Sequence, residues 1–127
     1  MIQRLSLIAG WLALAFIAFA TLSPIAERPA MAGPQLEHFV AFAAMGCAFA
    51  MGYPKRTLIF IVLVIAGAFG LEALQLLTPD RHGRLIDAAV KAAGGICGVG
   101  VGRFALLLLE RRAQRVYARL GWEPPAS

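Results

Sequence analysis

The sequence predicts an all-α integral membrane protein, a bundle of four transmembrane helices with a short basic amphipathic segment at its C-terminus. Of the 127 residues, 60% are apolar and only 15% are charged, and the mean hydropathy is +0.74. That balance is too apolar for a water-soluble domain of this length. The apolar residues also form runs of about 20, the helix length that crosses a hydrocarbon core roughly 30 Å thick. The predicted spans are residues 5–22, 34–51, 57–77 and 85–109, and they fill a single domain, 1–127.

The first span allows a second interpretation. Arg4, the apolar run that follows it and the small residues Ala18 and Ala20 also fit a secretory signal with cleavage after Ala20. Cleavage would leave three spans. The run is at the long end for a signal and the rest of the chain is itself polytopic, so a retained first helix is favoured.

The connections give the orientation. Lys55 and Arg56 form the short turn between the second and third spans, on the same side as Arg4 and the arginine-rich tail 110–127. The basic residues of the other side are Arg28, Arg81 and Arg84. Because cytoplasmic loops carry the excess of Lys and Arg, both termini and the tail are expected in the cytoplasm.

The net charge of +5 is also compatible with nucleic-acid binding, but the tail explains much of it. A basic stretch such as "RRAQRVYARLGW" beside a membrane helix is typical of an amphipathic segment on anionic headgroups. We therefore expect membrane lipids as partners and no nucleic acid. Neither a phosphate-binding glycine loop nor zinc-ligand spacing occurs, so no cofactor and no metal are expected. Cys47 and Cys97, both in mid-span, are expected to pack as small apolar side chains.

Ionisable side chains gather near one end of three predicted helices. Glu72 lies five residues before the end of its span, about 8 Å below it at 1.5 Å per residue. Asp87 begins the fourth span, and Lys91 follows at the i+4 spacing that brings a carboxylate and an ammonium together. His38 opens the second span. An ionised group facing lipid costs at least about 2.5 kcal/mol, so these groups are expected to turn inward and to enclose a polar pocket open to the outside.

The helix faces support this arrangement. At 100° per residue, Asp87 and Lys91 share one stripe with Gly94, Gly98 and Gly102. Glycine at this spacing lets another backbone approach closely, within the bundle or in a homo-oligomer. The matching faces are His38, Phe42, Met45, Phe49 and Gly52 in the second span and Ala68, Glu72, Gln75 and Leu76 in the third.

Two stretches, "LEHFVAFAAMG" and "EALQLLTPDRHGRLIDAAVKAAGG", resemble the VanZ-like family of small multi-span bacterial membrane proteins. That family typically has a His-Phe pair, Glu-x-x-Gln, a Pro-x-Arg turn, and an Asp four residues before an Asn, followed by glycines. The matching positions are His38, Phe39, Phe42, Glu72, Gln75, Pro79, Arg81 and Asp87. The resemblance covers roughly residues 21–102. Lys91 stands where the family usually has Asn, and Gln35, Leu36 and Glu37 replace an Asp-Lys pair.

The resemblance implies a multi-pass protein of the bacterial cytoplasmic membrane with a role in the cell envelope, in the setting of teicoplanin or other glycopeptide resistance. It implies no particular reaction.

Binding is the leading function that the residues predict. The pocket would bind an anionic lipid headgroup or a cell-envelope precursor. The expected ligand-binding residues are Arg81, Arg84, Gln75 and Lys91. A purely structural role stands beside this, in which a Glu72–Arg81 salt bridge fixes the hairpin between the third and fourth spans.

Two other functions are alternatives. A membrane enzyme acting on a lipid-linked substrate at the outer leaflet would use His38, Glu72 or Asp87 as catalytic groups. The lack of a Gly-x-Ser-x-Gly elbow and of a paired-His metal motif disfavours it. A small oligomeric transporter or holin-like pore is disfavoured because the charges lie toward one face rather than at the midplane.

Overall fold

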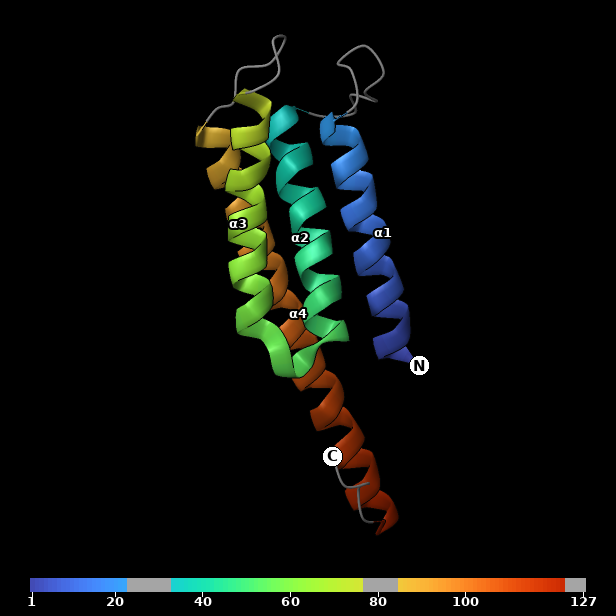
Figure 1. Cartoon of the computed structure of the whole chain (residues 1–127). Helices are drawn as coiled ribbons and strands as arrows, with labels where there is room; N and C mark the ends of the chain where they lie inside the picture. Colours follow the sequence, from blue (N-terminus) through green and yellow to red (C-terminus); the bar gives the residue numbers. More distant parts are fainter. Residues whose placement is uncertain (23–32, 77–84, 123–127) are drawn as a thin grey trace.

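The computed structural model describes residues 1–22, 33–76 and 85–122, and the regular secondary structure of those ranges is helical. The elements are α1 (Ile2–Leu22), α2 (Pro34–Gly52), the 3-10 turn η2 (Pro54–Arg56), α3 (Thr57–Leu76) and α4 (Leu85–Leu120). Successive α-helices alternate in direction along one bundle axis (Figure 1). We call the end that holds Met1 and η2 the turn end. The end where α1 and α3 finish and where α2 and α4 begin is the polar end.

Three described helices are long and apolar enough to cross a membrane, which supports the predicted membrane class. They are Ile2–Thr21, Pro54–Leu74 and Leu85–Leu120. α2 is not among them, because Gln35, Glu37 and His38 stand in its first turns. α2 nevertheless runs between the two ends of the bundle, since α1 finishes and α3 starts at opposite ends (Figure 1). The four predicted spans therefore correspond to three apolar helices and a less apolar one that they partly cover.

α4 packs most extensively on α2, through the predicted glycine stripe. Gly94, Gly98 and Gly102 face the backbone at Phe39, Ala43 and Cys47 in turn. A Cβ at any of these glycines would meet main-chain atoms of α2, so only glycine allows the two helices to lie this close. The close approach predicted for the stripe takes place inside the chain. A homo-oligomer through these three glycines stays an untested prediction.

The core draws on all four helices. Its buried cluster comprises Ile17, Phe42, Met45, Phe49, Val64, Ala68 and Ala92. The predicted inward face of α2 is confirmed, because Phe42, Met45 and Phe49 are each at most 4% exposed. Toward the turn end, the Phe49 ring lies 5.5 Å from Trp11 in an edge-to-face contact and 4.9 Å from Phe60 in a stacked one. These aromatic contacts join α1, α2 and α3 at the turn end.

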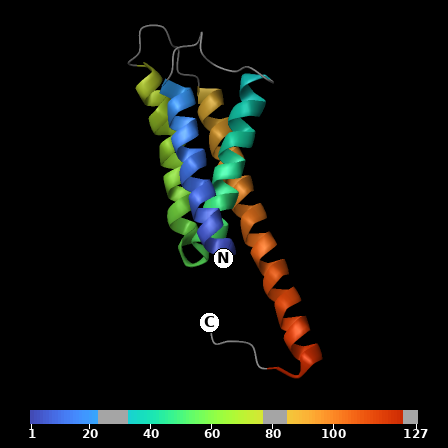
Figure 2. The same ribbon diagram turned by 90° about the vertical axis from the view of Figure 1, so that its right-hand side faces the viewer.

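The basic tail is a continuation of α4 rather than a separate amphipathic segment. α4 is unbroken to Leu120 and extends past the bundle (Figure 2). Its sequence from Arg103 to Leu120 contains neither Gly nor Pro, so nothing interrupts the helix. It ends in a Schellman motif, in which Gly121 has φ 67° and the Trp122 N–H donates to the Tyr117 carbonyl at 3.0 Å. The continuous helix carries the arginines of the tail past the bundle, and their binding to anionic headgroups stays a prediction.

Replacing Gly98 by Ala tests the α2–α4 contact. The new methyl group would collide with the Ala43 backbone and push the helices apart, so we expect a loss of about 1–3 kcal/mol in the free energy of unfolding. The matched control is Gly100→Ala on the same helix, where no atom lies within 4 Å of the added Cβ. Thermal unfolding in detergent, followed by circular dichroism, compares the two. Equal melting temperatures would contradict the packing described.

Candidate functional site

A buried ion pair joins α3 to α4 near the polar end. The Lys91 ammonium donates a hydrogen bond to Oε1 of Glu72, and the two side chains form a salt bridge. Lys91 is 0% exposed and Glu72 is 5% exposed. Glu72 lies four residues before Leu76, the last residue of α3, so the pair is about one turn inside the bundle. The prediction that Glu72 and Lys91 turn inward is confirmed.

Small residues around Lys91 make room for its long side chain. Ala88 and Ala92 of α4 are both buried beside it. One turn further along α4, Gly94 accepts the α2 backbone while the adjacent Gly95 faces the Val64 side chain of α3. Lys91 therefore extends from a helix that is enclosed on two sides. An ammonium in such surroundings is stable only with a buried counter-charge, and Glu72 supplies it.

Asp87 does not form the i to i+4 pair with Lys91 that its spacing predicted. The described ion pair of Lys91 is with Glu72, and Oδ1 of Asp87 is buried and accepts no hydrogen bond from any residue that the structure describes. The spacing rule holds for helix surfaces, where a side chain is free to extend along the helix. Lys91 lies instead at a helix interface, and its nearest counter-charge is on the neighbouring helix. Asp87 is in the first turn of α4, where the helix N-terminus favours a carboxylate.

His38 lies at the same end of the bundle. It is in the second turn of α2 and half-buried, and the next residue, Phe39, packs its backbone against Gly94. Glu37, also half-buried, precedes it in the first turn. His38, Glu72, Asp87 and Lys91 are therefore at one end of the bundle, as predicted.

Sequence reasoning missed Thr21 as a member of this end. Thr21 is 5% exposed and stands in the last turn of α1, the helix that finishes at the polar end. The other polar residues of α1 stand in its first two turns, so a hydroxyl in its last turn was the signal that would have identified Thr21. With Thr21, all four helices contribute polar side chains to the polar end.

The remaining predicted ligand-binding residues lie outside the described part of the chain. Arg81 and Arg84 belong to residues 77–84, and the Gln75 side chain is also undescribed. The described members of the polar end carry three carboxylates and one ammonium, on Glu37, Glu72, Asp87 and Lys91. Taken alone, this set favours a ligand group that donates hydrogen bonds, such as an ammonium or a hydroxyl, at the unbonded oxygen of Asp87.

Metal-ligand and nucleophile chemistry have little support within the described ranges. No group of three or more His, Cys, Asp or Glu side chains among those residues is placed to hold a metal ion. Cys47 and Cys97 are free thiols in the middle of α2 and α4, with Cys47 half-buried and Cys97 exposed on the bundle surface. Cys47 agrees with the predicted role of a small packing side chain, whereas the prediction is wrong for Cys97, because that side chain is exposed.

Comparison with known proteins identifies no relative. No family model matches the chain, and neither does a curated protein or a solved structure. The resemblance to the VanZ-like family thus rests on the motifs of the sequence alone.

A double-mutant cycle measures the ion pair. Lys91→Met leaves Glu72 buried without its counter-charge, and Glu72→Leu does the same to Lys91, so each is expected to lower the free energy of unfolding by about 3–5 kcal/mol. The double variant removes both charges and should be more stable than either single variant. Glu110→Gln, at an exposed position of α4, is the control and should have little effect. Additive losses in the double variant would show that the two side chains do not interact.

Proposed function

We propose that this chain is an integral membrane protein whose polar end binds an anionic lipid headgroup or a lipid-linked cell-envelope precursor. The observation that carries the proposal of a ligand site is the buried Glu72–Lys91 pair and, one turn away, a buried Asp87 oxygen that no described residue bonds. The anionic character of the ligand is proposed from Arg81 and Arg84 of the sequence. Ionisable groups at membrane depth are costly, and they commonly mark sites of function. One ion pair suffices to fix α3 against α4, so the additional carboxylate is more than the packing requires.

The ligand would contact both signs of charge. Arg81 and Arg84, which the sequence places between α3 and α4, would bind its phosphate or other anionic group. Asp87 would accept a hydrogen bond from a hydroxyl or ammonium of the same ligand. Lys91 has three N–H donors, and the pair with Glu72 occupies one of them. Glu72 would then be a positioning residue, because its bond to Lys91 fixes where the ammonium lies relative to the ligand.

The sequence resemblance supports an envelope role. The motifs at His38, Glu72, Gln75, Arg81 and Asp87 are similar to those of the VanZ-like family. On that basis we propose the bacterial cytoplasmic membrane as the location, cytoplasmic termini, an outward polar end, and a function in envelope homeostasis or glycopeptide resistance. The excess of basic residues at the turn end agrees with that orientation.

A membrane enzyme acting on a lipid-linked substrate is the second candidate. The unbonded oxygen of Asp87 favours it, because a general base must have an oxygen free to accept a proton. Glu72 is less suited to that task, since Lys91 already binds it. His38 stays a candidate at the same end. A transporter or pore would need polar groups nearer the midplane, and the described ionisable side chains of the bundle lie toward its two ends.

Mass spectrometry of co-purified lipids tests the binding function. The wild-type protein is expected to retain one headgroup class, which Arg81→Ala and Asp87→Asn should each reduce by at least about tenfold, since a charge-assisted hydrogen bond contributes about 1.5–3 kcal/mol. The matched controls are Arg115→Ala and Glu110→Gln, which change the same charges on the exposed end of α4. The same lipid profile in all five proteins would contradict a ligand site at the polar end.

A further inference from the structure

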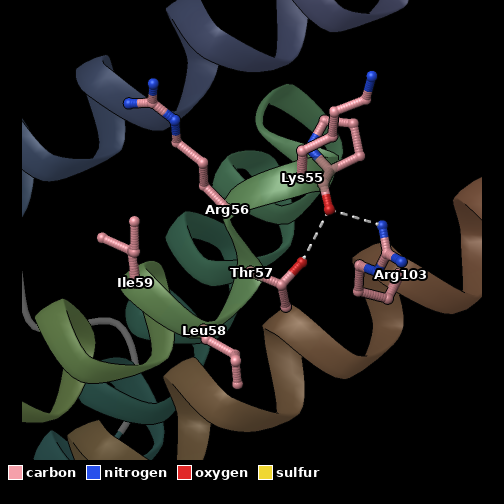
Figure 3. A pocket seen from close by; sticks show the side chains of 7 residues that line it. Lys55, Arg56, Thr57, Leu58, Ile59 and Arg103 are labelled. Atoms are coloured by element: carbon pink, nitrogen blue, oxygen red, sulfur yellow. Dashed lines mark hydrogen bonds between the residues drawn. The ribbon is translucent and has the colours of Figure 1, made fainter.

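The turn end carries a cavity that the polar site does not use. It has a volume of about 420 Å³ and lies at η2 and the start of α3, beside α4 (Figure 3). The lining residues are Pro54, Lys55, Arg56, Thr57, Leu58, Ile59 and Arg103. Three of them are cations and none is acidic. A cavity of this size is within the range of small-molecule sites.

We propose that this cavity binds the phosphate headgroup of an anionic phospholipid. Lys55 and Arg56 stand on the exposed turn, and Arg103 reaches the same turn from α4. Basic pockets between membrane helices on the cytoplasmic side recognise such headgroups. With three cations and no carboxylate in the lining, a lipid with a net negative charge is favoured over a zwitterionic one.

Arg103 is held in place by the turn itself. Its Nη1 donates to the Pro54 carbonyl at 3.0 Å, and the Thr57 hydroxyl donates to the same oxygen at 3.2 Å (Figure 3). The guanidinium thus has donors left over for a ligand, since arginine has five N–H groups. Arg103 is 16 residues after Asp87 on α4, about four turns, so it lies away from the polar end. Its contact with the turn adds a cation to the cavity.

Along the bundle axis, the cationic and apolar lining residues follow one another in the same order as the headgroup and the acyl chains of a phospholipid. The cations lie at the turn, whereas Leu58 and Ile59 follow inside the first turn of α3 and are 78% and 54% exposed. Arg103 is 18 residues after Leu85, about 27 Å along α4, which is close to the thickness of a hydrocarbon core. The cations therefore fall at headgroup level and the apolar wall at acyl-chain level. A free phosphate ion would make no use of that wall, so the ligand is a lipid.

Native mass spectrometry of the full chain, with phosphatidylglycerol competing against phosphatidylcholine, tests the site. We expect the wild type to prefer phosphatidylglycerol. Lys55→Gln combined with Arg56→Gln should reduce that preference about 25-fold, or about fivefold for each cation removed at the membrane surface. Both side chains are exposed, so the variant should keep the melting temperature of the wild type.

The control is Arg111→Gln combined with Arg112→Gln, which removes the same charge about 12 Å further along α4. That distance exceeds the Debye screening length, so the preference of this control variant for phosphatidylglycerol should change less than about twofold. Equal losses of lipid preference in the two double variants would show that general electrostatic attraction to the surface binds the lipid, and this would overturn the proposal. Displacement of the lipid by an equal concentration of inorganic phosphate would also overturn it.

Discussion

The described bundle depends on one constraint. An ammonium group that is buried between apolar helices needs a carboxylate beside it. Lys91 is fully buried, and Glu72 of the neighbouring helix binds it. The pair fixes how far α3 extends along α4 and which faces the two helices present to each other. It also leaves Asp87, one turn away, with a buried oxygen that no described residue bonds. The candidate site therefore depends on the burial of the Lys91 ammonium and on its pairing with Glu72.

The two ends of the bundle differ because their side chains differ. Toward the turn end, Phe49 and its aromatic neighbours fill the space between α1, α2 and α3. Glycines run along the face of α4 that packs on α2, and near the polar end Gly94 and Gly95 let α2 and α3 come close on either side of α4. Close helices leave little volume, and the long stem of Lys91 fills part of it. Packing and charge placement are thus two consequences of the same stretch of sequence.

The sequence predicted the helical bundle, the inward face of α2 and the end at which the charges gather, because each follows from a period of 3.6 residues and from the cost of charge in lipid. It did not predict which carboxylate binds Lys91. Sequence spacing favoured Asp87, and the choice of Glu72 depends on the interhelical geometry, which no local pattern specifies. The continuation of α4 to Leu120 was missed for a related reason, since the tail was interpreted by its charge rather than by its lack of helix-breaking residues.

Solid-state nuclear magnetic resonance of the protein in lipid bilayers measures this pairing directly. With Lys91 labelled at Nζ and the carboxylates labelled with carbon-13, the account predicts a strong through-space coupling between Lys91 Nζ and the Glu72 carboxylate carbon, together with a weaker one to Asp87. A dominant coupling to Asp87, or none to Glu72, would contradict the account.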